Sequence, residues 1–132
     1  MQIVNVKDVA KGTELVYCGR SRGWWGMPSL MGNPFSHHAI SQARHIGESR
    51  EEVILAYKHY LWATMQGKAK CTVVLKGQKV EIDVLLTKSI VEEFFASLTD
   101  ESILACHCKP QACHCDVIAA AYMWWKSQNN RP

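Results

Sequence analysis

The sequence lacks the features of an exported, membrane-spanning or disordered chain. It opens with MQIVNVKDVAKGTELVY, in which no basic segment leads into an apolar run, so we expect no signal peptide. Its apolar runs are too short and too interrupted to predict a transmembrane helix. Hydrophobic residues make up 48% of the 132 positions and charged residues 20%, which is typical of a globular domain. We therefore expect a single cytoplasmic domain spanning residues 1–132.

The chain also lacks a large excess of positive or negative charge. The net charge is only +3, and the lysines and arginines are dispersed along the chain, so we expect neither a nucleic acid nor a membrane as the partner. Six cysteines are present, in contrast. In a reducing cytosol such cysteines are metal-bound, catalytic or simply reduced more often than they are paired in disulfides.

Short apolar runs alternate with amphipathic segments along the chain. Ser49 and Glu52 have the spacing of a capping box, which predicts that a helix starts there and ends near Gly67. The order of elements predicts an α/β fold with a mainly parallel, Rossmann-like central sheet, helices on both faces and an added β-hairpin. The expected elements are strands at 2–6, 14–19 and 102–108, a hairpin at about 70–86, and helices at 50–66, 89–98 and from 113 or 114 onward.

A long segment between residues 20 and 47 has no periodicity and is rich in glycine and proline. Loops of that length in a compact domain are usually functional. The adjacent Trp24 and Trp25 are costly to expose, so we expect them to stack on a ligand or contact a partner, preferably as a lid over a pocket.

The stretch ILACHCKPQACHCDV holds four of the six cysteines. It predicts a strand, a turn at Lys109–Pro110, and a helix that begins near Cys113 or His114. In open α/β sheets, ligands bind beyond the carboxyl ends of the strands, and the first turn of a helix offers backbone N–H groups to anions. A cysteine at that position should have a lowered thiol pKa.

The segments VYCGR, MGNPF, SREEVILAYKHYL and LACHCKPQACHCDV follow one another along the chain. Together they resemble domain-of-unknown-function family 4326, a group of small domains common in phages and bacteria. The departures from its pattern are His107, where tryptophan is usual, and Cys115, where a small residue is usual. The resemblance implies the order of the elements and the place of the site but no established reaction. The matching residues are Gly19, Arg20, Gly32, Asn33, Pro34, Phe35, Arg50, Glu51, Tyr57, Cys106, Cys108, Pro110, Cys113, His114 and Asp116.

One hypothesis for the site is a pocket for a small anionic ligand, namely a nucleotide, nucleoside or phosphosugar, without a cofactor. A thiol, an imidazole and a carboxylate would handle the ligand as in a transferase or hydrolase, or the same pocket would only sequester it. The candidate catalytic residues are Cys108, Cys113, His114 and Asp116. The candidate ligand-binding residues are Gly19, Arg20, Trp24, Trp25, Gly32, Asn33 and Lys109.

The alternative hypothesis is a structural or interaction domain that binds zinc, since four thiolates suit tetrahedral Zn²⁺. The candidate ligands are Cys106, Cys108, Cys113 and Cys115, with His114 as a possible replacement for Cys115. A third interpretation is that the cysteines only fill the core, because reduced cysteine is among the most buried residue types. We expect that core or edge role for Cys18 and Cys71.

Overall fold

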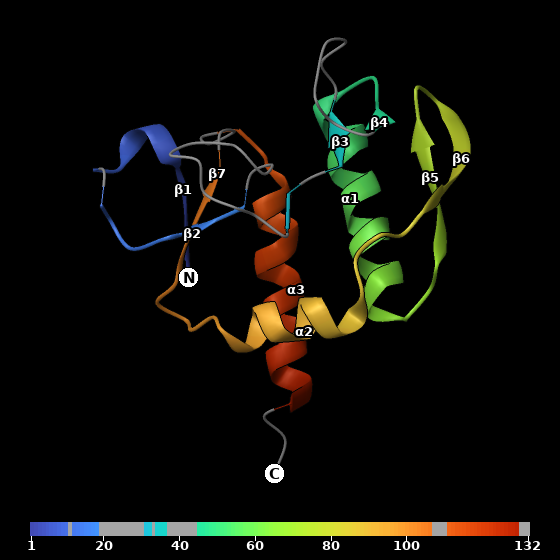
Figure 1. Ribbon diagram of the computed structural model, residues 1–132. Helices are drawn as coiled ribbons and strands as arrows, with labels where there is room; N and C mark the ends of the chain where they lie inside the picture. The colour runs from blue at the N-terminus through green and yellow to red at the C-terminus, as the bar shows by residue number, and fades with distance from the viewer. Residues whose placement is uncertain (11, 19–30, 33, 37–44, 107–110, 130–132) are drawn as a thin grey trace.

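The computed structural model describes residues 1–10, 12–18, 31–32, 34–36, 45–106 and 111–129. Within these ranges the chain is a mixed α/β fold with three α-helices, one 3₁₀-helix and three small sheets (Figure 1). The elements are β1 (Gln2–Asn5), η1 (Val6–Asp8), β2 (Val16–Tyr17), β3 (Phe35–Ser36), β4 (His45–Ile46), α1 (Arg50–Met65), β5 (Lys70–Leu75), β6 (Gln78–Asp83), α2 (Lys88–Ala96), β7 (Ile103–Cys106) and α3 (His114–Asn129).

The largest sheet has three parallel strands in the order β1-β7-β2. Leu104, Ala105 and Cys106 of the central strand are buried, as expected for a strand covered on both faces. This strand therefore forms the centre of the sheet. The predicted α/β class is confirmed, but a Rossmann-like central sheet is not. The other described strands pair separately, as parallel β3-β4 and antiparallel β5-β6, and the hairpin packs against α1 instead of extending the sheet.

Helix α1 begins where its capping residues predict. The Ser49 hydroxyl accepts a hydrogen bond from the backbone N–H of Glu52, and Gly67 follows the helix with a positive φ of 73°. The Glu52 carboxylate reaches beyond the helix and accepts hydrogen bonds from the backbone N–H groups of Lys76 and Gly77. A hydrogen bond from the backbone N–H of Glu48, together with these two bonds, lowers the pKa of Glu52. The bonds from Lys76 and Gly77 attach the hairpin turn to the start of α1.

The turn of the hairpin offers a simple test of the backbone geometry. Lys76 has φ 53° and Gly77 has φ 75°, the pair of positive values that a type I′ turn requires. Asparagine tolerates this conformation better than lysine, so Lys76→Asn should raise the free energy of unfolding by about 0.5 kcal/mol in a urea titration. Lys76→Val should lower it, because β-branched residues resist positive φ. Equal effects of the two substitutions would contradict the assigned turn.

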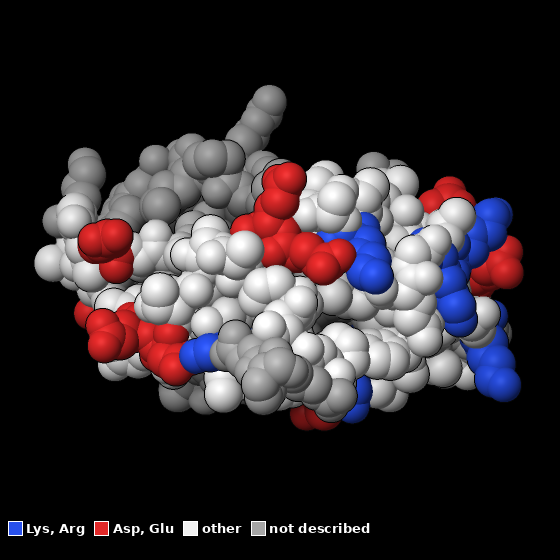
Figure 2. All heavy atoms as spheres, turned by 90° about the horizontal axis from the view of Figure 1, so that it is seen from below, with Lys and Arg blue, Asp and Glu red and all other residues white. Residues whose placement is uncertain are grey.

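The buried core lies between the helices and the sheets. Tyr57, Phe95, Leu104 and Ile118 are all at most 1% exposed and come from α1, α2, β7 and α3 respectively. In Figure 1, α1 and α3 stand beside each other, and α2 runs across the lower part of α3. No helix in the described part of the chain is both long enough and apolar enough to cross a bilayer. On the face shown in Figure 2, basic side chains are interspersed with acidic ones.

Candidate metal centre

The first turn of α3 is capped by the motif cysteine and the motif aspartate. The Cys113 sulfur accepts a hydrogen bond from the backbone N–H of Cys115 at 3.3 Å. The Asp116 carboxylate in turn accepts one from the backbone N–H of Cys113 at 3.0 Å. This is the reciprocal arrangement of a capping box, with a thiol in the place of a hydroxyl. It fixes the Cys113 sulfur at the positive end of the helix dipole.

Three cysteine sulfurs meet at this helix start. The Sγ atoms of Cys106, Cys113 and Cys115 all lie within 4.8 Å of one another, and those of Cys106 and Cys113 are 3.0 Å apart. Cys106 ends β7, whereas Cys113 and Cys115 belong to the start of α3. All three side chains are at most 1% exposed. The candidate zinc ligands Cys106, Cys113 and Cys115 are thus brought together.

The cluster stabilises the protonated form of the Cys115 thiol. Hydrogen bonds with the thiols of Cys106, Cys113 and Cys18, together with burial, raise the pKa of Cys115 far above its usual range. Without a metal, the Cys115 thiol therefore keeps its proton at neutral pH. A thiophilic cation would have to displace this proton in order to bind.

His114 joins the cluster to the end of β2. Its Nε2 lies 2.5 Å from the backbone carbonyl oxygen of Cys18. Because a carbonyl can only accept, Nε2 must carry the proton of this hydrogen bond. The other ring nitrogen, Nδ1, lies 3.7 Å from the Cys113 sulfur. The imidazole is therefore oriented by the Cys18 backbone, while the Asp116 carboxylate accepts a hydrogen bond from the Cys113 backbone.

Two residues of α1 hold the segments around the cluster. The Tyr57 hydroxyl donates a hydrogen bond to the carbonyl of Met31 at 3.0 Å, and its ring centroid is 5.0 Å from that of His114. Burial, with the neighbouring thiols as smaller causes, raises the pKa of Tyr57 well above its usual range, so the hydroxyl remains a donor. Arg50 donates to the carbonyl of Ala112 at 3.2 Å. Sequence reasoning had no signal for these contacts beyond the place of both residues in the motif.

The structure brings together the predicted site residues Cys113, His114 and Asp116 on the start of α3. Gly32 follows Met31, whose carbonyl is bound by Tyr57. The other residues predicted for the pocket or the metal lie outside the described ranges, so their place in the site stays a prediction. They are Gly19, Arg20, Trp24, Trp25, Asn33, Cys108 and Lys109.

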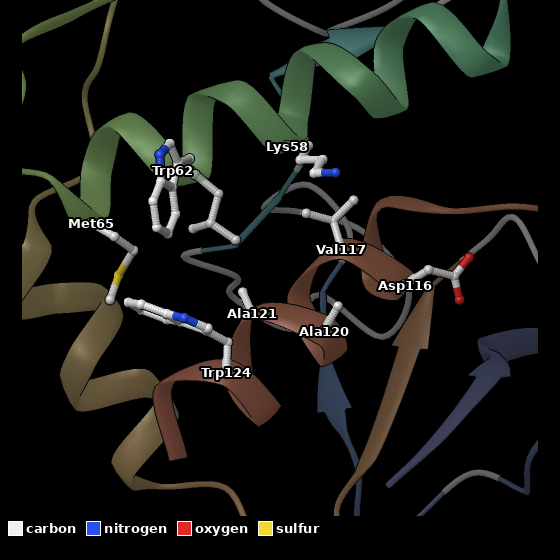
Figure 3. A pocket seen from close by; sticks show the side chains of 9 residues that line it. Lys58, Trp62, Met65, Asp116, Val117, Ala120, Ala121 and Trp124 are labelled. Carbon is white, nitrogen blue, oxygen red and sulfur yellow. The ribbon is translucent and has the colours of Figure 1, made fainter. Parts of the chain in front are cut away.

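A separate groove of about 400 Å³ runs between α1 and α3 (Figure 3). Trp62 and Trp124 meet edge to face across it with their ring centroids 5.3 Å apart. Ala120 and Ala121 also line this groove, and the Lys58 and Asp116 side chains lie at its far end in the figure. The groove is therefore mainly apolar, with one side chain of each charge.

His114 should matter for folding because its imidazole satisfies a buried carbonyl. His114→Ala removes this donor and leaves the Cys18 carbonyl unsatisfied, so we expect a loss of about 2 kcal/mol in the free energy of unfolding. The matched control is His59→Ala, since His59 is exposed on α1 and should tolerate the change. Urea unfolding of both variants without metal measures the difference. Equal small losses would show that the imidazole bond adds no stability.

The comparisons with known proteins agree with the motifs. Residues 2–124 match the family described as a domain of unknown function (DUF4326). No curated protein and no solved structure matches the chain. The matched range extends from β1 into α3 and contains every cysteine of the cluster. Because the match covers most of the 132 residues, the chain belongs to the DUF4326 family.

Proposed function

We propose that this domain binds a zinc ion through the thiolates of Cys106, Cys113 and Cys115. The observation that carries the proposal is the mutual distance of their sulfurs, all within 4.8 Å. Zinc–sulfur bonds of about 2.3 Å in a tetrahedron place neighbouring sulfurs about 3.8 Å apart. The distance between the Cys106 and Cys113 sulfurs, 3.0 Å, and the upper limit of 4.8 Å enclose that value. Only small side-chain movements are therefore needed to receive the ion.

The position of the cluster favours a structural role for the metal. The three sulfurs come from the end of β7 and the start of α3, so an ion between them would join the central strand to the closing helix. On binding, each coordinating thiol releases its proton, and the resulting thiolates bind the cation. The N–H group of Cys115, which already points at the Cys113 sulfur, offsets part of the added negative charge.

Burial makes zinc the better proposal than direct thiol catalysis. A nucleophile must reach its substrate, but the Cys113 side chain is only 1% exposed. A structural zinc site, by contrast, is closed to solvent and substrate. Cys113 and His114 therefore fit a structural metal site, in which the thiol of Cys113 binds the ion and the imidazole of His114 positions the neighbouring backbone.

Zinc content of the purified protein tests the proposal. Protein expressed with zinc and purified without chelator should contain one zinc ion per chain by elemental analysis. Cys106→Ser should lose most of this zinc. The control Cys71→Ser should keep it, because Cys71 lies in β5 and is not part of the cluster. Wild-type protein without zinc, or equal zinc in both variants, would overturn the proposal and leave the thiols as core residues.

A second candidate function is the binding of a nucleoside or nucleotide, in an enzyme or in a protein that only sequesters the ligand. The groove between α1 and α3 supports it, because its volume lies in the range of small-molecule pockets and tryptophan faces can stack on bases. In this alternative, Asp116 lines the groove and contacts the ligand, whereas Cys113 and His114 do not line the groove.

Tryptophan fluorescence distinguishes this candidate from the first. Addition of adenosine or AMP should quench the emission of the wild type and of Cys106→Ser alike, and Trp124→Ala should abolish the response. Exposed Trp62 partners Trp124 in the groove, so Trp62→Ala should also weaken it. No quenching by purine or pyrimidine nucleosides and nucleotides would refute binding in this groove.

A further inference from the structure

We infer that Cys18 is the fourth ligand of this metal centre, so that zinc is held by four thiolates from β7, α3 and the end of β2. This inference rests on the proposed function and names a ligand that the cysteine-rich stretch does not contain. A site with Cys18, Cys106, Cys113 and Cys115 would have no open position for water or substrate. Such a closed site is structural and not catalytic.

The strand register places Cys18 beside Cys106. Val16 pairs with Leu104 and Tyr17 pairs with Ala105, so the next residues of these two parallel strands are Cys18 and Cys106. The backbone N–H of Cys18 donates to the Ala105 carbonyl at 2.8 Å, which continues the ladder to this level. Paired residues of neighbouring strands point to the same face of a sheet. The two cysteines therefore share the face on which α3 begins.

The surroundings of Cys18 agree with this placement. The residue is completely buried in the same core cluster as Cys106, Cys113 and Cys115. Its thiol donates a hydrogen bond to the Val16 carbonyl at 3.7 Å and lies near enough to the Cys115 thiol to contribute to the raised pKa of Cys115. Its backbone carbonyl is held by His114, the residue between the two helix cysteines. Cys18 thus lies beside the cluster and is bonded to it through its main chain.

His114 fits the fourth position less well than Cys18 does. Its Nε2 is engaged with the Cys18 carbonyl, and its Nδ1 faces the Cys113 sulfur. Ligation through Nε2 would break a buried hydrogen bond. In its present place the imidazole acts as a positioning residue, because it fixes the backbone of one ligand and lies against the sulfur of another.

The nature of the metal follows from the size of the cluster. An iron–sulfur cluster is also held by four cysteines, but its irons and sulfides fill the centre and require a wider ring of thiolates. The sulfurs of Cys106, Cys113 and Cys115, all within 4.8 Å of one another, fit a single tetrahedral ion. To join them, the Cys18 thiol would have to turn away from the Val16 carbonyl, to which it donates at 3.7 Å. Of the common thiophilic cations, zinc matches this tetrahedral set of four sulfurs. The ion would then link Cys18, which follows β2, to Cys106 at the end of β7. These two strands are neighbours in space but distant in sequence.

The test compares the zinc affinity of three serine variants, measured by competition with a chromophoric chelator. Cys18→Ser should bind zinc at least tenfold more weakly than wild type, the size of loss expected for one ligand or its support. Cys71→Ser should bind like wild type. If Cys18→Ser also binds like wild type, Cys18 is not a ligand. If Cys108→Ser is weakened in its place, the fourth thiolate is Cys108, and the inference is overturned.

A measurement on the unaltered chain guards against misfolding of the variant. Wild-type protein loaded with cobalt should show the charge-transfer and ligand-field absorption of four thiolates around a tetrahedral ion. A spectrum of three thiolates with one nitrogen or oxygen would overturn the role of Cys18 but leave the proposed zinc site intact. Absence of any cobalt or zinc binding would instead refute the proposed function itself.

Discussion

Removal of zinc is expected to lower the free energy of unfolding of this domain by several kcal/mol. A ligand that binds only the folded state stabilises it by about 4 kcal/mol when its concentration exceeds the dissociation constant a thousandfold. Cys18 lies far along the chain from the thiols of β7 and α3, so the complete four-thiolate site exists only after folding. Urea titrations with added zinc and after chelation measure the difference.

The matched control for this prediction is the same pair of titrations on Cys106→Ser and Cys71→Ser. Chelation should not change the urea midpoint of Cys106→Ser, because its site is already broken. The midpoint of Cys71→Ser should fall as in the wild type. If chelation leaves the wild-type midpoint unchanged, the domain does not depend on a metal.

The metal-free domain should lose stability as the pH rises above about 8.5, the usual pKa of a thiol. In the folded chain the pKa of Cys115 is raised, whereas in the unfolded chain this thiol ionises near its usual pKa. Above that pH the unfolded state therefore binds fewer protons than the folded state, and the free energy of unfolding falls as the pH increases. The expected slope is about 1.4 kcal/mol per pH unit for each thiol that remains protonated in the folded state.

The zinc-loaded domain should respond to pH in the opposite direction. Its thiols are already deprotonated, so high pH takes nothing further from the site, whereas low pH returns protons that compete with the metal. Stability should thus decline toward acid in the loaded protein and toward alkali in the metal-free protein. Urea midpoints between pH 6 and pH 10 test this, and identical pH profiles for the two forms would contradict it. Contributions from other groups, such as Cys71, cancel in the comparison.

Local sequence patterns predicted the three α-helices and most of the strands, but not the short pair β3-β4, which lies in the segment that was predicted to be a loop. The Ser49–Glu52 capping box located the start of α1, and Gly67 located its end. The alternating run after Gly77 gave the hairpin. The size of the parallel sheet was overestimated, because periodicity identifies a strand but not its partners. Whether β5 and β6 join the sheet or pack on α1 depends on tertiary contacts that no local pattern encodes.

The candidate site was predictable only in part. The cysteine-rich stretch indicated three of the proposed ligands, since they lie close together in sequence. Cys18 was assigned to the core, because in the sequence it is a lone cysteine after a short strand. The structure buries Cys18 in the core as predicted, and its proposed role as a ligand rests on the register of β2 against β7, which places it at the level of Cys106. The sequence did contain one clue, namely a cysteine at the end of each of two expected parallel strands.

X-ray absorption at the zinc edge of the purified wild-type domain tests the central claim most directly. The spectrum reports both the kind and the number of atoms bound to the metal. Our account predicts one zinc ion per chain with four sulfur neighbours at about 2.3 Å. A first shell dominated by nitrogen or oxygen, or a protein that contains no zinc when expressed and purified with zinc present, would contradict it.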